Sequence, residues 1–140
     1  MSGFLVDTNV LSELRKGSRC NAAVRSWFDG VHEGDLYLSV VVLGEIRRGI
    51  EQVRIHNRTS ANALEKWLTR IATDFSDRIL AVDTAVADVW GRLGLKQRVP
   101  VLVALLAATA LVHDLTVVTR DSAGFRNTGA RILNPFEFSE

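Results

Sequence analysis

Three acidic residues occupy positions from which they could bind one divalent cation. Asp7 directly follows the apolar run of residues 3–6, and Asp121 lies just past the apolar run of residues 115–119. Glu45 lies about one and a half turns into a helix predicted after the second strand. Ligands of an open parallel sheet bind outside the carboxyl ends of its strands. Three carboxylates at that edge repel one another and favour a bound cation, and oxygen ligands suit Mg²⁺ or Mn²⁺ better than Zn²⁺.

Each acidic residue also has a purely structural interpretation. Asp7 could be a helix N-cap, Asp121 could form a turn, and Glu45 could be a solvated helix residue. Their joint placement after three predicted strands favours the metal site.

The predicted elements alternate between short strands and helices. Apolar runs predict strands at 3–6, 35–40, 79–82, 115–119 and 130–133. Apolar periodicity and capping residues predict helices at about 8–16, 21–33, 39–56, 59–74, 83–95 and 100–113, the first of them capped by Thr8 or Asn9. Strands that alternate with helices, several of them fully apolar, predict an α/β fold with a parallel sheet covered on both faces.

Composition narrows the class of protein. The 140 residues are one domain's length, and a net charge of +1 neither requires nor excludes nucleic acid. The one cysteine, Cys20, cannot form an intramolecular disulfide, so we expect a reducing, cytoplasmic location. Asp7 interrupts the first apolar run, which argues against a signal peptide. Residues 99–112 are too short an apolar run to span a membrane.

Four ordered segments resemble the PIN-domain ribonucleases of the VapC/FitB type, the toxins of prokaryotic type II toxin–antitoxin pairs. They are LVDTNVLSEL, LSVVVLGEIRRGI, AATALVHDLTVVTRD and ILNPFEF. The resemblance covers the whole chain and implies a single PIN domain over residues 1–140, with four to five parallel strands and helices on both faces. It also implies RNA cleavage with Mg²⁺ or Mn²⁺, a homodimer, and a small DNA-binding antitoxin that blocks the site. Operator DNA would be reached only through that antitoxin, and no membrane is involved.

The resemblance assigns roles to individual residues. Asp7 is similar to the family's first metal-binding acid, Glu45 to the second and Asp121 to the fourth. Small polar residues that orient these acids correspond to Thr8, Asn9 and Thr119.

The third acid of the family is missing. The family pattern resembles PVIDGLIAATA, whereas residues 100–110 read PVLVALLAATA, so Val103 stands where the aspartate is expected. Asp114 lies about three turns, or roughly 16 Å, further along the helix and cannot replace it. We therefore expect low or absent activity. Two readings follow: a weakened ribonuclease toxin, or a catalytically dead module that binds an antitoxin without cleaving RNA.

Other polar residues fit this reading less directly. Arg47 and Arg48, close to Glu45, could contact RNA, whereas Arg54 and Arg58 fit a solvated helix face. A phosphoacceptor signalling domain would need a lysine after a late strand, where this chain has Arg120. The apolar surfaces of residues 40–43 and 85–90 exceed what a domain of this size should need, which favours a homodimer.

Overall fold

A five-stranded parallel sheet forms the centre of the computed structural model, which describes residues 3–139. The strand order is β3-β2-β1-β4-β5, and the strands are β1 (Phe4–Val6), β2 (Leu36–Ser39), β3 (Ile79–Leu80), β4 (Thr116–Val118) and β5 (Ile132–Leu133). In the central pairs, Phe4 lies opposite Leu36 on β2 and Thr116 on β4. The predicted α/β fold with a parallel sheet is confirmed.

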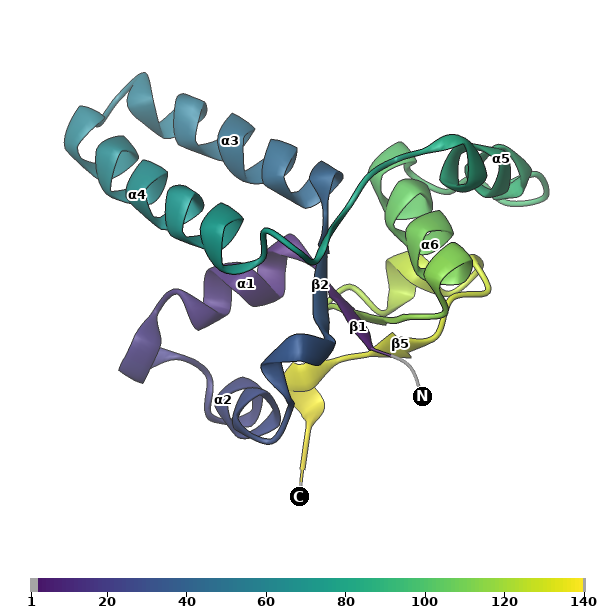
Figure 1. Cartoon of the computed structure of the whole chain (residues 1–140), viewed down its shortest axis with the longest axis horizontal. Coiled ribbons are helices and arrows are strands. Elements are labelled where there is room, and N and C mark those ends of the chain that lie inside the picture. The colour runs from purple at the N-terminus through teal and green to yellow at the C-terminus, as the bar shows by residue number, and fades with distance from the viewer. Residues whose placement is uncertain (1–2, 140) are drawn as a thin grey trace.

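Within the described residues, six α-helices flank this sheet on both sides. They are α1 (Thr8–Leu14), α2 (Ala22–Asp29), α3 (Val40–Arg54), α4 (Arg58–Asp74), α5 (Thr84–Arg92) and α6 (Val101–His113). Figure 1 shows α3 and α4 as an antiparallel pair, with α5 and α6 on the opposite side of the sheet. Leu5, Leu38 and Val117 are fully buried at the centre of the core between these layers.

Several predicted boundaries were wrong, each for a local reason. Asp7, rather than Thr8 or Asn9, is the N-cap of α1, because its side chain accepts a hydrogen bond from the Thr8 N–H. The first helix ends at Leu14, two residues before the predicted end, and a 3₁₀ turn over residues 17–19 follows.

The second and fifth helices are also shorter than predicted. Helix α2 ends at Asp29 instead of residue 33, because residues 33–35 form a separate 3₁₀ turn capped by the His32 side chain. Helix α5 ends at Arg92, ahead of Gly94, whose φ of 74° is incompatible with a continuing helix.

The uncharged helix α6 is a core element. Its buried residues are Ala104, Leu106, Ala107, Ala108, Thr109 and Ala110. The small side chains among them allow neighbouring elements to approach closely. Within residues 3–139, no helix is long and apolar enough to cross a membrane.

Candidate active site

Asp7 occupies the carboxyl end of the central strand β1 and is held there by four neighbours. Its N–H continues the strand pairing by donating to the Val118 carbonyl at 2.9 Å. One carboxylate oxygen, Oδ1, accepts from the Thr8 N–H at 2.8 Å. The other, Oδ2, accepts from the Thr119 hydroxyl at 2.8 Å and from Asn9 Nδ2 at 3.4 Å. The carboxylate is therefore fixed by two helix residues and one residue of the neighbouring strand end.

Thr8 joins Asp7 to the second predicted ligand. Its hydroxyl donates to Glu45 Oε1 at 2.9 Å, while its N–H is bound to Asp7. Glu45 reaches this point because Ser39 caps α3 at the end of β2 and starts the helix beside the sheet edge. Residues 37 positions apart thus meet at the carboxyl end of the sheet.

Asn9 and Thr119 organise the end of β4. Thr119 is fully buried, and its Oγ1 accepts from the Asp121 N–H at 2.9 Å and from Asn9 Nδ2 at 3.3 Å. The side-chain oxygen Oδ1 of Asn9 accepts from the Arg120 N–H at 3.1 Å. The backbone around Asp121 is therefore tied to the first turn of α1. Each of the three residues expected to orient the acids donates a hydrogen bond to at least one of them: Thr8, Asn9 and Thr119.

Asp121 is less enclosed than the other two acids. Its side chain is exposed, and Oδ1 accepts from the Gly124 N–H at 3.0 Å. The carboxylates of Asp7 and Glu45 are thus bridged through Thr8, whereas Asp121 is joined to Asp7 through Thr119 by its backbone N–H and not by its carboxylate.

The two enclosed carboxyl groups have raised pKa values. Burial is the main cause for Asp7; hydrogen bonds from Thr119 and Thr8 oppose it, and repulsion from Asp121 adds to it. Burial also raises the pKa of Glu45, opposed by the hydrogen bond from Thr8 and reinforced by repulsion from Asp7. A cation bound between these mutually repelling carboxylates would stabilise their charged forms.

The carboxylates of this site could bind a hard cation only together with further ligands such as water or phosphate. Across residues 3–139, no three acidic, histidine or cysteine side chains lie close enough together to enclose a metal. The three carboxylates therefore converge less closely than predicted. Thr8 bridges Asp7 and Glu45, whereas Asp121 lies at the exposed edge of the site. Mg²⁺ usually keeps several waters and binds through one or two carboxylates plus substrate phosphates. Asp7 and Glu45 meet that requirement.

Val103 lies in the first turn of α6, which contains no acidic residue. The valine is half-buried and packs against the hydrophobic core. Its neighbour Leu102 lines a groove of about 630 Å³ together with Glu45, Arg48 and Gly49. The start of α6 therefore reaches the Glu45 groove through Leu102, and its first turn supplies only apolar side chains.

The two arginines predicted near Glu45 lie on different sides of α3. Arg48 lines the Glu45 groove. Arg47 lines a separate cavity against α4 and forms ion pairs with Glu51 at 2.9 Å and Glu65 at 3.1 Å. Arg54 binds the same two acids, so Arg47 and Arg54 belong to one surface ion network. Of the predicted pair, only Arg48 has its side chain beside the acidic site.

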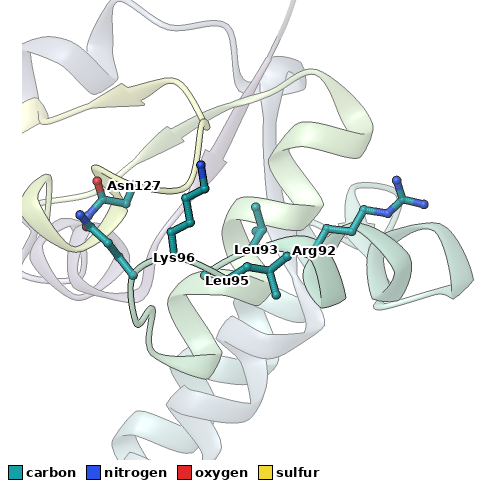
Figure 2. Close-up of a pocket in the computed structure, with 7 residues that line it drawn as sticks. Arg92, Leu93, Leu95, Lys96 and Asn127 are labelled. Atoms are coloured by element: carbon teal, nitrogen blue, oxygen red, sulfur yellow. The ribbon is translucent and has the colours of Figure 1, made fainter.

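A further cavity, shown in Figure 2, contains none of the predicted site residues. It has a volume of about 430 Å³ and lies between the segment from Arg92 to Gln97 and Asn127. Lys96 and Arg92 extend in different directions from its wall (Figure 2). This lining contains two cationic side chains, Lys96 and Arg92, and no acid, so it does not make an acidic metal site.

Sequence reasoning missed Gly124. Its N–H binds Asp121, and an added Cβ would lie 2.7 Å from Asp121 Cγ, so a side chain at this position would displace the Asp121 carboxylate. The only sequence signal was a glycine three residues after a candidate acid.

The chain is similar to known proteins over most of its length. A family model described as "PIN domain" matches residues 4–130. The chain is 34% identical to the plasmid stability protein StbB of Pseudomonas syringae pv. tomato, over 96% of this chain and 99% of that protein. It is 32% identical to the toxin FitB of Neisseria gonorrhoeae, with 95% and 98% covered.

Two further similar proteins are a ribonuclease and a chain of a DNA-bound complex. The VapC ribonuclease Y4jK of Sinorhizobium fredii is 31% identical, over 96% of this chain and 98% of that protein. The solved structure of FitAB bound to a DNA fragment contains a chain with a TM-score of 0.85 and 29% identity, with 98% of both chains covered.

Proposed function

This chain belongs to the PIN-domain family, and on that premise we propose that it is the toxin of a type II toxin–antitoxin pair. Its site is that of an Mg²⁺- or Mn²⁺-dependent endoribonuclease, weakened or silenced by Val103. The observation that carries the proposal is the bridge from Asp7 through Thr8 to Glu45, an oxygen-only acidic site at the carboxyl edge of the sheet. The similarity to the toxin FitB and to the VapC ribonuclease supports it.

The chain's own residues would bind and orient the reactants. Asp7 and Glu45 would hold the cation, and Asp121 would approach from the rim, directly or through water. Thr8, Asn9 and Thr119 keep these carboxylates in place. When bound, Mg²⁺ or Mn²⁺ would stabilise negative charge on the oxygens of the reacting phosphodiester. Arg48, in the Glu45 groove, is placed to contact an RNA phosphate.

Val103 limits what this site can do. A ligand missing from the first turn of α6 should weaken the metal, because loss of even an indirect partner of a metal costs about 10- to 100-fold. This supports a second candidate function: a PIN domain that binds its antitoxin without cleaving RNA. The chain as written, assayed on single-stranded RNA with Mn²⁺ and with EDTA, separates the two. Cleavage that EDTA abolishes supports the weakened enzyme, and no cleavage with Mn²⁺ supports the inactive module.

We further propose that the partner is a small DNA-binding antitoxin. The acids Asp7, Glu45 and Asp121 suit an arginine or lysine from that protein, since a charge-assisted hydrogen bond to a carboxylate is among the strongest available. Operator DNA would be bound through the antitoxin, an arrangement consistent with the DNA-bound FitAB structure. The free Cys20 is compatible with the cytoplasmic location we propose.

A homodimer completes the proposal. Large apolar side chains are exposed at the start of α3, beside and on α5, and at the start of α6: Val40, Val82, Trp90, Val101 and Leu102. Apolar exposure of this kind marks protein interfaces. We also propose that residues 1–140 form one PIN domain, because the sheet draws its strands from Phe4 to Leu133.

A further inference from the structure

The Asp121 carboxylate occupies the volume in which a side chain at position 124 would begin. A Cβ built on Gly124 would lie 2.7 Å from Asp121 Cγ and 3.0 Å from Oδ1, with Oδ2 closer still. Such approaches are shorter than van der Waals contact allows. At the same time the Gly124 N–H donates to Oδ1 at 3.0 Å. Gly124 therefore both makes room for this carboxylate and binds it.

The backbone conformation at position 124 does not require a glycine. The glycines with positive φ in residues 3–139 are Gly17, Gly94 and Gly129. Gly124 lies in the middle of the 3₁₀ turn Ala123–Phe125, a conformation open to any L-residue. Space beside Asp121 is the feature that a larger residue would remove.

That space controls only the side chain of Asp121. Its backbone N–H is bound to Thr119 Oγ1, and the same oxygen donates to Asp7 Oδ2. The backbone of Asp121 is thus anchored to the site independently of position 124. Because the Asp121 side chain is exposed, a carboxylate pushed by a new methyl group could rotate away into solvent. The consequence of a side chain at 124 would be a misplaced acid.

We propose that Gly124 is a positioning residue of the acidic site, which keeps the Asp121 carboxylate on the side of Asp7 by leaving it room and by donating its N–H. This inference rests on the proposed function, in which Asp121 takes part in metal binding. Gly124 itself touches neither metal nor RNA in this account.

The test is a double-mutant cycle on Mn²⁺ affinity, measured by titration calorimetry on the otherwise unaltered chain. Gly124→Ala should lower Mn²⁺ affinity by about as much as Asp121→Ala, on the order of 10-fold or more. The double variant should lose no more than Asp121→Ala alone, because Gly124 acts only through that carboxylate. Gly91→Ala is the matched control, since nothing lies within 4 Å of its added Cβ, and its affinity should not change.

The outcomes separate this inference from the proposed function. Equal Mn²⁺ affinity of Gly124→Ala and the unaltered chain, or additive losses in the double variant, would overturn the positioning role alone. No Mn²⁺ binding by the unaltered chain would contradict the proposed metal site and the inference together. If Gly124→Ala melts early in EDTA, the double variant should melt no earlier than Asp121→Ala alone, because removing the carboxylate removes the clash. A double variant that melts earlier than Asp121→Ala would overturn the inference.

Discussion

The hydroxyl of Thr119 donates a hydrogen bond to Asp7 Oδ2 at 2.8 Å, joining residues 112 positions apart in the chain. Thr119 is fully buried, and the same oxygen accepts from the Asp121 N–H. Two strand ends and two acids are therefore organised by one threonine.

Replacing this threonine by valine should destabilise the fold. Thr119→Val keeps the shape but leaves the partly buried Asp7 carboxylate with one donor fewer, so we expect a loss of about 1–3 kcal/mol in the free energy of unfolding. Urea denaturation at pH 7 measures it. Thr69→Val is the matched control, because the Thr69 hydroxyl binds only the Glu65 carbonyl on an exposed helix face. A loss no larger than the control's would contradict the assigned role.

Stability without metal should depend on pH through Asp7 and Glu45. Both pKa values are raised in the folded state, so the folded chain binds protons more readily than the unfolded chain. The contribution of these groups to stability is therefore greatest at low pH and is lost as pH rises through their folded pKa values. The double variant Asp7→Asn, Glu45→Gln should lack this component of the pH profile. Identical profiles for the two proteins in EDTA would refute the assignment.

Arg48 and Arg47 should differ in their effect on RNA binding. Arg48 lines the Glu45 groove, whereas Arg47 is paired with Glu51 and Glu65. Arg48→Gln should weaken binding of single-stranded RNA and reduce the slope of log affinity against log salt by about 0.7, the value for one lost phosphate contact. Fluorescence anisotropy over a salt series measures both. An equal effect of Arg47→Gln on RNA binding would contradict the assignment of the phosphate contact to Arg48 and the Glu45 groove.

The chain should be a dimer in solution. The exposed side chains of Trp90, Val101 and Leu102 provide an apolar surface between copies. Sedimentation at micromolar concentration should give twice the 15.5 kDa of one chain. Trp90→Arg should shift the equilibrium towards the monomer while the far-UV circular dichroism is retained. A monomer for the unaltered chain would exclude the dimer.

The order of elements could be predicted because their signals are local. Buried apolar runs mark strands, and Pro100 marks the start of the last helix, of which it is the N-cap. Asp7 and Glu45 could be proposed as neighbours from the sequence because each closely follows such a run, and a hydrogen-bonded bridge through Thr8 joins them. The ends of the elements were harder to predict. The His32 side chain caps a 3₁₀ turn between α2 and β2 by accepting from the Gly34 N–H, and the spacing of these two residues is the only sequence signal for this turn.

Relations across the fold could not be obtained in this way. Arg47 and Arg48 are neighbours in sequence. The pair Arg47–Glu51 is local to α3, but only the packing of α4 against α3 brings Glu65 to Arg47. The room that Gly124 leaves for Asp121 is a property of three-dimensional packing, which residue type and spacing do not contain.

The most direct test of the account compares the unaltered chain with Val103→Asp in an RNA cleavage assay, with Mg²⁺, with Mn²⁺ and with EDTA. The new carboxylate would join Asp7 and Glu45 from the first turn of α6. We expect metal-dependent cleavage to rise by at least the order of 100-fold. Melting in EDTA should be earlier, because a further buried charge is unpaired, and Mg²⁺ should restore stability by binding the folded state.

A matched control shows whether position 103 is special. Leu111→Asp adds an acid to a more exposed position near the other end of α6 and should leave cleavage at the level of the unaltered chain. A large, EDTA-sensitive gain confined to Val103→Asp is the predicted result. Equal cleavage by the Val103→Asp protein and the unaltered chain, or a Val103→Asp protein indifferent to metal, would contradict the account and make position 103 ordinary core.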